Sequence, residues 1–128
     1  MNKSKTILLV ERDPINKFLF EKILNKCEFN IISTNNTEQA FEHFRHQPFD
    51  LIMMDFLITD TSGVAFAEDV RKNEFTTKKT PIILTITSPL SDVLTNKILE
   101  LRPILILEKP ITYNDLTLAL KRMMNIEP

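Results

Sequence analysis

The chain has 128 residues, of which 43% are hydrophobic and 26% are charged, so it fits one globular domain with a buried core and is not a disordered chain. Sixteen basic residues oppose seventeen acidic ones, and this net charge of −1 indicates neither nucleic acid nor a membrane surface as a partner.

The chain begins with an apolar strand and an amphipathic helix. Residues 6–10 (TILLV) are short, apolar and rich in β-favouring residues, and they are too few for a signal peptide or a membrane span. We therefore expect a cytoplasmic protein. Asp13 and Pro14 predict the start of a helix, as its N-cap and first residue. The apolar positions that recur along this helix are Ile15, Phe18, Leu19, Ile23 and Leu24.

The alternation of strand and helix continues to the end of the chain. Further strands are predicted at 30–34, 51–54, 81–87 and 104–107. The helices between them are predicted to begin at Asn36 or Thr37, at Gly63, at Ser91 or Asp92, and after a capping box of Thr112 and Asp115. Five strands and five helices joined by short loops favour an α/β fold, in which helices cover both faces of a doubly wound parallel sheet.

Polar residues follow four of the predicted strands. Asp55 stands inside one of the most apolar runs of the chain, where an isolated carboxylate is unfavourable unless solvent or partners reach it. The others are Glu11, Arg12, Asp13, Thr87, Ser88, Lys109 and Pro110. Each has an ordinary structural explanation as a cap or a turn. Together, at the edge shared by the carboxyl ends of parallel strands, they form a candidate nucleophile, a hydroxyl group and a fixed cation.

These motifs resemble the response-regulator receiver domain of two-component signalling, and the resemblance covers residues 1–128 as a single domain. LLVERDPIN (8–16) is similar to the first strand and acidic turn of the family, and DLIMMDFLITDTSG (50–63) is similar to its phosphoacceptor strand and loop. Thr87-Ser88 and Lys109-Pro110 resemble its last two signatures. The resemblance implies a flavodoxin-like, three-layer fold with a five-stranded parallel sheet of order 2-1-3-4-5 and five helices.

The resemblance also implies a role for each residue, in a signalling protein that is not an enzyme. Asp55 would accept a phosphoryl group from a histidine kinase or a histidine phosphotransfer protein, and the changed surface would act on a downstream protein partner. Lys109 would neutralise the new charge, Thr87 would follow the phosphoryl group, and Ser88 would leave room for it. The ligands of Mg²⁺ would be Glu11, Asp55 and the backbone carbonyl of Leu57. Pro110 would follow a cis peptide bond.

Arg12 departs from the family pattern, because a second acidic residue usually stands there. A guanidinium in place of a carboxylate predicts weak or absent Mg²⁺ binding. Arg12 would either pair with Asp55 and Glu11 or turn into solvent. Ile106 stands where the family usually has an aromatic switch residue. These departures leave open an alternative function, in which the chain is a degenerate receiver that binds proteins independently of phosphorylation.

Two other functions on the same architecture fit poorly. A flavin carrier needs a phosphate loop rich in Ser, Thr and Gly after the first strand, and ERDPINK (11–17) is not such a loop. A phosphatase of the haloacid dehalogenase type usually has a second Asp two positions after the nucleophile, where Leu57 stands. Cys27, the only cysteine, excludes an internal disulfide and is expected to be a small buried or half-buried filler.

Overall fold

A computed structural model of the chain describes residues 3–57, 63–74 and 77–125. Its strands form one parallel sheet in the order β2-β1-β3-β4-β5, which confirms the predicted topology. The strands are β1 (Thr6–Val10), β2 (Asn30–Thr34), β3 (Leu51–Asp55), β4 (Ile82–Ile86) and β5 (Ile104–Glu108). The sheet order reverses between β1 and β3, so the ends of these two strands lie where a doubly wound sheet places its site.

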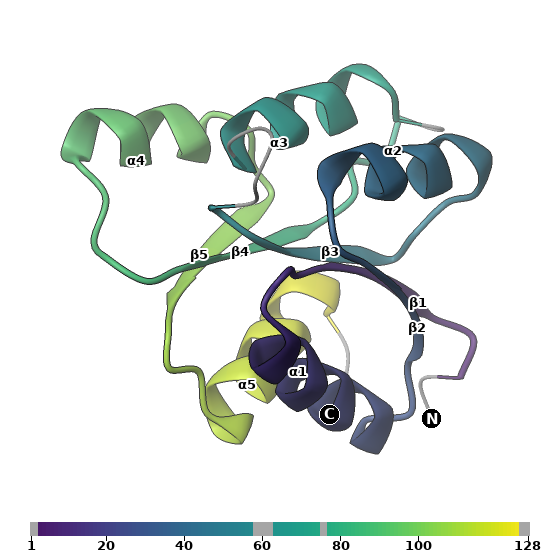
Figure 1. The fold of residues 1–128 in the computed structure, drawn as a ribbon. Coiled ribbons are helices and arrows are strands. Elements are labelled where there is room, and N and C mark those ends of the chain that lie inside the picture. The colour runs from purple at the N-terminus through teal and green to yellow at the C-terminus, as the bar shows by residue number, and fades with distance from the viewer. Residues whose placement is uncertain (1–2, 58–62, 75–76, 126–128) are drawn as a thin grey trace.

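Helices cover both faces of the sheet and complete three layers (Figure 1). One face carries α1 (Pro14–Lys26) and α5 (Tyr113–Met124). The other carries α2 (Thr37–His46), α3 (Gly63–Lys72) and α4 (Asp92–Leu99). The fold is therefore the flavodoxin-like, doubly wound α/β arrangement that the sequence predicts. No helix in the described part of the chain combines the length and apolar character needed to cross a membrane.

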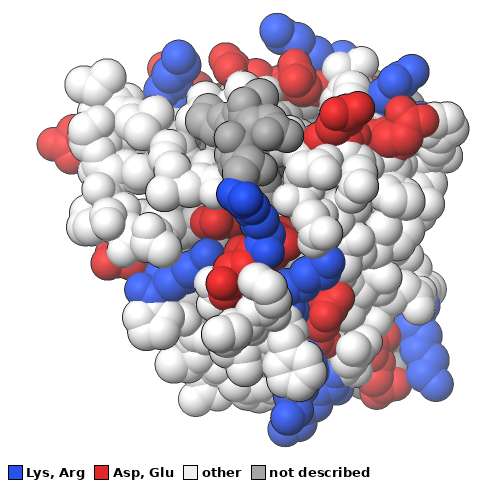
Figure 2. Space-filling view, viewed as in Figure 1, with Lys and Arg blue, Asp and Glu red and all other residues white. Residues whose placement is uncertain are grey.

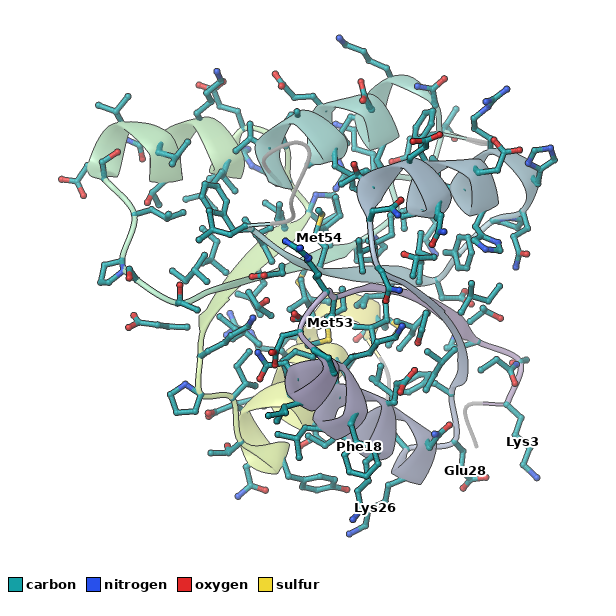
Figure 3. The ribbon with its side chains drawn as sticks, in the orientation of Figure 1. Lys3, Phe18, Lys26, Glu28, Met53 and Met54 are labelled. Atoms are coloured by element: carbon teal, nitrogen blue, oxygen red, sulfur yellow. The ribbon has the colours of Figure 1, made fainter. Side chains whose placement is uncertain are left out.

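The core is divided by the sheet into two apolar clusters. Successive residues of a strand point to opposite faces, and Figure 3 shows Met54 and Met53 on opposite sides of β3. Met54 joins the cluster beneath α2, α3 and α4, whereas Met53 joins the cluster beneath α1 and α5. Both side chains are at most 1% exposed. Because the central strands are buried on both faces, their ends are held rigidly and can position polar side chains.

The predicted helix starts are confirmed by their capping bonds. The Asp13 side chain accepts a hydrogen bond from the Asn16 backbone N–H at 2.9 Å, and Pro14 begins α1. Of the alternatives left open by the sequence, Asn36 caps α2 and Ser91 caps α4. Both bonds of the Thr112–Asp115 capping box are present at the start of α5.

The apolar face of α1 differs from the one predicted. Ile15 is 70% exposed and Phe18 is 61% exposed, and Figure 3 shows Phe18 on the outer side of the helix. Leu24, which was among the predicted positions, is buried, and it forms the buried stripe with Phe20, one turn before it. At about 100° per residue, Phe18 lies roughly 160° around the helix from Phe20. Apolar recurrence at helical spacing therefore indicated the helix but identified its packing side only in part, at Ile23 and Leu24.

Candidate functional site

Glu11 is held at the end of β1 and is almost completely buried. Its backbone N–H donates to Thr34 O at 3.1 Å, so the ladder between β1 and β2 continues one residue beyond the strand. The side chain is 1% exposed. Carboxylate oxygen Oε2 accepts a hydrogen bond from the Asp13 backbone N–H at 3.0 Å. The turn into α1 therefore fixes the orientation of this carboxylate.

Asp55 is the last residue of β3, where it pairs in register with Thr85 of β4. The next residue, Phe56, donates its backbone N–H to Thr85 O at 2.8 Å, so the backbone on both sides of Asp55 is tied to the sheet. The Asp55 side chain is 14% exposed. The carboxylate is thus partly buried but still reached by solvent. This contact with water explains why a charged residue is tolerated at the end of an apolar strand.

Lys109 supplies the cation that these two carboxylates require. Its backbone N–H donates to Ile86 O at 2.8 Å, which extends the ladder between β4 and β5. Ammonium nitrogen Nζ donates to Glu11 Oε1 at 3.2 Å and lies 3.3 Å from Asp55 Oδ1. The Lys109 side chain is 10% exposed, so the bridge is screened from bulk water. The peptide bond between Lys109 and Pro110 is cis, as expected from the family resemblance.

The environment of Glu11 raises the pKa of its carboxyl group above the ordinary value. Burial is the largest cause, and the nearby negative charge of Asp55 acts in the same direction. The hydrogen bond from the Asp13 backbone and the ammonium of Lys109 lower the pKa but do not offset the burial. Glu11 and Asp55 therefore compete for one cation across the edge of the sheet.

Arg12 is exposed and forms no ion pair with Glu11 or Asp55. The expected pairing of Arg12 with these two carboxylates is therefore wrong, and the outward orientation that was its alternative is the one observed. The physical reason is that Lys109 already occupies the space between the carboxylates. Asp13 is also committed elsewhere, because its carboxylate caps α1.

The remaining predicted residues surround this ion-paired centre without joining it. Thr87 and Ser88 follow β4 directly and are exposed. Neither forms a hydrogen bond with another residue in the described part of the chain. Leu57, whose carbonyl was a candidate metal ligand, lies two residues beyond Asp55 with its side chain 67% exposed. Thr59, which stands where the loop after the phosphoacceptor usually has proline in this family, lies outside the described residues.

The acidic groups available for a metal are few. Among residues 3–57, 63–74 and 77–125, no group of three or more His, Cys, Asp or Glu side chains is arranged to hold a metal ion. Glu11 and Asp55 both lie near the ammonium of Lys109, and Arg12, directly after Glu11 in the chain, adds a second positive charge. Figure 2 shows acidic and basic side chains side by side in the middle of the viewed face.

Sequence reasoning placed Lys109 opposite Asp55 but missed its bond to Glu11. A signal for it was present, because Glu11 follows four apolar strand residues and a buried carboxylate needs a cation or several donors. The partner was hidden because β1 and β5 are not neighbours in the sheet.

The chain belongs to the response-regulator receiver domain family, whose model matches residues 7–121. It is 30% identical over 126 residues to the autoinducer 1 sensor kinase/phosphatase LuxN of Vibrio campbellii. That match covers 97% of this chain and 14% of LuxN, so the chain spans about a seventh of that relative. Receiver domains are signalling modules of two-component systems.

Solved structures share the fold at lower identity. The receiver domain of a sensor histidine kinase from Pseudomonas aeruginosa, with a magnesium ion coordinated in its active-site cleft, is 24% identical with a TM-score of 0.82. That match covers 95% of this chain and 98% of that one. The receiver domain of Ssk1 from Saccharomyces cerevisiae, solved with the histidine phosphotransfer protein Ypd1, is 21% identical with a TM-score of 0.80. Here the coverage is 94% of this chain and 89% of that one.

Proposed function

We propose that this chain accepts a phosphoryl group at Asp55 from a phosphohistidine partner and signals through a change in its surface. The observation that supports this best is the pairing of a partly open carboxylate with a fixed cation, because Lys109 Nζ lies 3.3 Å from Asp55 Oδ1. Phosphoryl transfer depends mainly on positioning and on neutralising the charge of the moving oxygens.

The proposed reaction is an in-line displacement at phosphorus. A carboxylate oxygen of Asp55 attacks, the bond from phosphorus to the imidazole nitrogen of the donor histidine breaks, and that nitrogen keeps the electron pair. Lys109 neutralises charge on the Asp55 side. The hydroxyl of Thr87 turns toward the new phosphoryl group, and Ser88 leaves space for it. Both residues are exposed, so this movement needs no repacking of the core.

We propose that the partner upstream is a histidine kinase or a histidine phosphotransfer protein. Relatives include the sensor kinase LuxN, and one receiver of the same fold is known together with a phosphotransfer protein. A downstream protein partner would then read the phosphorylated surface.

We also propose that Mg²⁺ binds weakly or not at all. Glu11 and Asp55 contribute two negative charges, and Lys109 and Arg12 contribute two positive ones, so these four side chains together are neutral. A divalent cation prefers sites with several oxygen ligands and an excess of negative charge. One unit-charge pair at about 4 Å is worth on the order of 4 kcal/mol near a protein surface, and even after a several-fold reduction by solvent around the exposed Arg12 this is comparable with the roughly 1.4 kcal/mol of a tenfold change in affinity.

Intact-mass spectrometry after exposure to phosphoramidate or acetyl phosphate tests the acceptor role. We expect the wild-type protein to gain the mass of one phosphoryl group and Asp55→Asn to gain none while keeping its fold by circular dichroism. Asp50→Asn is a matched control, because Asp50 is an exposed aspartate directly before the first residue of β3. Equal labelling of wild type and Asp55→Asn would remove Asp55 from the mechanism.

The exposed guanidinium of Arg12 favours a second candidate function, that of a degenerate receiver that binds its partner without phosphorylation. The same experiment separates the two functions. If the wild-type protein stays unlabelled with every donor, and if wild type and Asp55→Asn bind the partner with equal affinity, the chain is an interaction module.

A further inference from the structure

We propose that Arg12 holds the transferred phosphoryl group in place of a metal ion, so that Asp55 accepts phosphate without Mg²⁺. This inference rests on the proposed function and adds a residue to it. On this proposal, the arginine at position 12 takes part in phosphoryl transfer, and its presence does not mean that the activity has been lost.

Arg12 is close enough to reach the oxygens of a phosphoryl group on Asp55. Val10 pairs with Met54 in the parallel ladder, so the next residues, Glu11 and Asp55, lie side by side. Arg12 is one residue further along. β1 ends at Val10, so Arg12 lies in the turn into α1, where one Cα–Cα step of about 3.8 Å separates it from Glu11. Glu11 and Asp55 share Lys109 Nζ at 3.2 and 3.3 Å, and a long, flexible arginine side chain that starts one residue from this site can turn toward it.

Arg12 is also available. It is exposed, and it forms no ion pair or hydrogen bond with any residue in the described part of the chain. Lys109, in contrast, is shared between Glu11 and Asp55 at 3.2 and 3.3 Å. The ammonium of Lys109 is therefore already paired with two carboxylates, whereas the guanidinium of Arg12 is exposed and has no such partner among the described residues.

Phosphorylation adds negative charge at Asp55, and a second cation would balance part of it. A carboxylate with one negative charge becomes an acyl phosphate with two at neutral pH. Glu11, Lys109 and the phosphorylated Asp55 would together carry a charge of −2. A guanidinium reduces this excess, and its planar pair of N–H groups matches two phosphoryl oxygens. Backbone N–H groups alone would leave the excess charge unbalanced.

The step needs no further reactant. A carboxylate oxygen of Asp55 forms a bond to phosphorus while the bond from phosphorus to the nitrogen of the donor breaks. The leaving nitrogen retains the electron pair and takes a proton from water. Arg12 exchanges no proton, because its guanidinium stays charged throughout. Its contribution is electrostatic, and removing such a group from a phosphoryl-transfer site commonly slows the reaction by orders of magnitude.

The test is the rate of labelling by phosphoramidate, followed by intact mass, in EDTA and in Mg²⁺. We expect wild type to be labelled in EDTA and Arg12→Ala to be labelled on the order of tenfold to a hundredfold more slowly there. Arg12→Lys should recover part of the rate, since it keeps the charge but not the paired N–H groups. Arg45→Ala is the matched control, because Arg45 is an exposed arginine on α2.

Arg12→Asp should show the opposite dependence, with labelling only when Mg²⁺ is added. Mg²⁺ titration followed by NMR gives a readout besides the reaction, with shifts around Asp55 in Arg12→Asp at concentrations that leave wild type unchanged. Labelling of wild type only with Mg²⁺, or equal rates for wild type and Arg12→Ala in EDTA, would overturn this inference but keep Asp55 as the acceptor. Absence of labelling in every protein and condition would overturn the proposed function itself.

Discussion

Lys109 and Glu11 lie 98 positions apart in the chain, yet the ammonium of Lys109 donates to the carboxylate of Glu11 at 3.2 Å. The two residues directly follow β1 and β5, which are separated in the sheet by β3 and β4. Between them stands Asp55, 3.3 Å from the same ammonium. The cation therefore holds together the ends of three strands, and its role in stability cannot be separated from its role at the site.

Lys109→Ala is expected to destabilise the protein as well as slow its phosphorylation. Removal of one partner from a buried ion pair leaves an uncompensated charge, which commonly costs about 3–5 kcal/mol. Here Glu11 is 1% exposed and Asp55 is 14% exposed, so both carboxylates lose their cation away from bulk water. Urea unfolding at neutral pH measures the loss. The double variant Lys109→Ala/Glu11→Gln should regain part of the stability, and a double variant no more stable than Lys109→Ala would contradict the pairing.

Much of this arrangement could be predicted from local patterns. The apolar runs, the Asp13-Pro14 start of α1 and the Thr112–Asp115 capping box depend on residues close together in sequence, and all are confirmed. Parallel topology then brings the strand ends to one edge. The presence of Asp55 and Lys109 at one site follows from these two steps alone.

What could not be predicted depends on three-dimensional packing. Glu11 pairs with Lys109 and not with Arg12, because the Lys109 side chain extends between the two carboxylates. The spacing of residues in the sequence does not show which side chain does so. The exposure of Phe18 is similar, because the buried residues of α1 are Phe20 and Leu24, on the other side of the helix. A helical pattern with apolar residues on more than one side does not say which side is buried.

Gly63→Ala is expected to lower stability by about 1–3 kcal/mol, the usual cost of overpacking. A Cβ at Gly63, the only glycine in the chain, would lie 2.8 Å from Leu84 Cδ1 and 3.2 Å from the backbone Cα of Phe56. The start of α3 is held there by a 2.9 Å bond from Gly63 N–H to Phe56 O, so the helix cannot easily move away. Chemical denaturation provides the measurement. Because alanine normally stabilises a helix relative to glycine by roughly 0.5–1 kcal/mol, a gain of that size would show that the contact is not tight.

Arg71→Ala is expected to be among the most destabilising substitutions outside the site. The Arg71 side chain is 9% exposed and donates to the carbonyls of Thr80, Leu101 and Pro103 and to the Glu74 carboxylate. Its loss removes a charged donor from three carbonyls and the cation from the Glu74 carboxylate, which is 10% exposed, so a loss of about 3 kcal/mol or more is expected.

Lys72→Ala is the control for Arg71→Ala, because Lys72 is the next residue of α3 and is exposed. It should change the unfolding free energy by less than about 0.5 kcal/mol. Thermal and urea unfolding of both variants give the comparison. Equal stability of the two variants would mean that the hydrogen bonds of Arg71 contribute nothing.

Cys27 is expected to react slowly with iodoacetamide at pH 8 in the folded protein. The thiolate is the reactive form, and burial is the main reason that the pKa of Cys27 lies above its ordinary value of 9.0. A raised pKa means a smaller thiolate fraction at pH 8, so the alkylation rate should be low there and should climb as the pH passes 9. The hydrogen bond with Tyr113 lowers the pKa, so Tyr113→Phe should slow alkylation further. Unfolding in urea should restore the rate of an ordinary cysteine. A folded protein that is alkylated at pH 8 as fast as the unfolded one would show that the packing of α1 against the sheet does not shield this thiol.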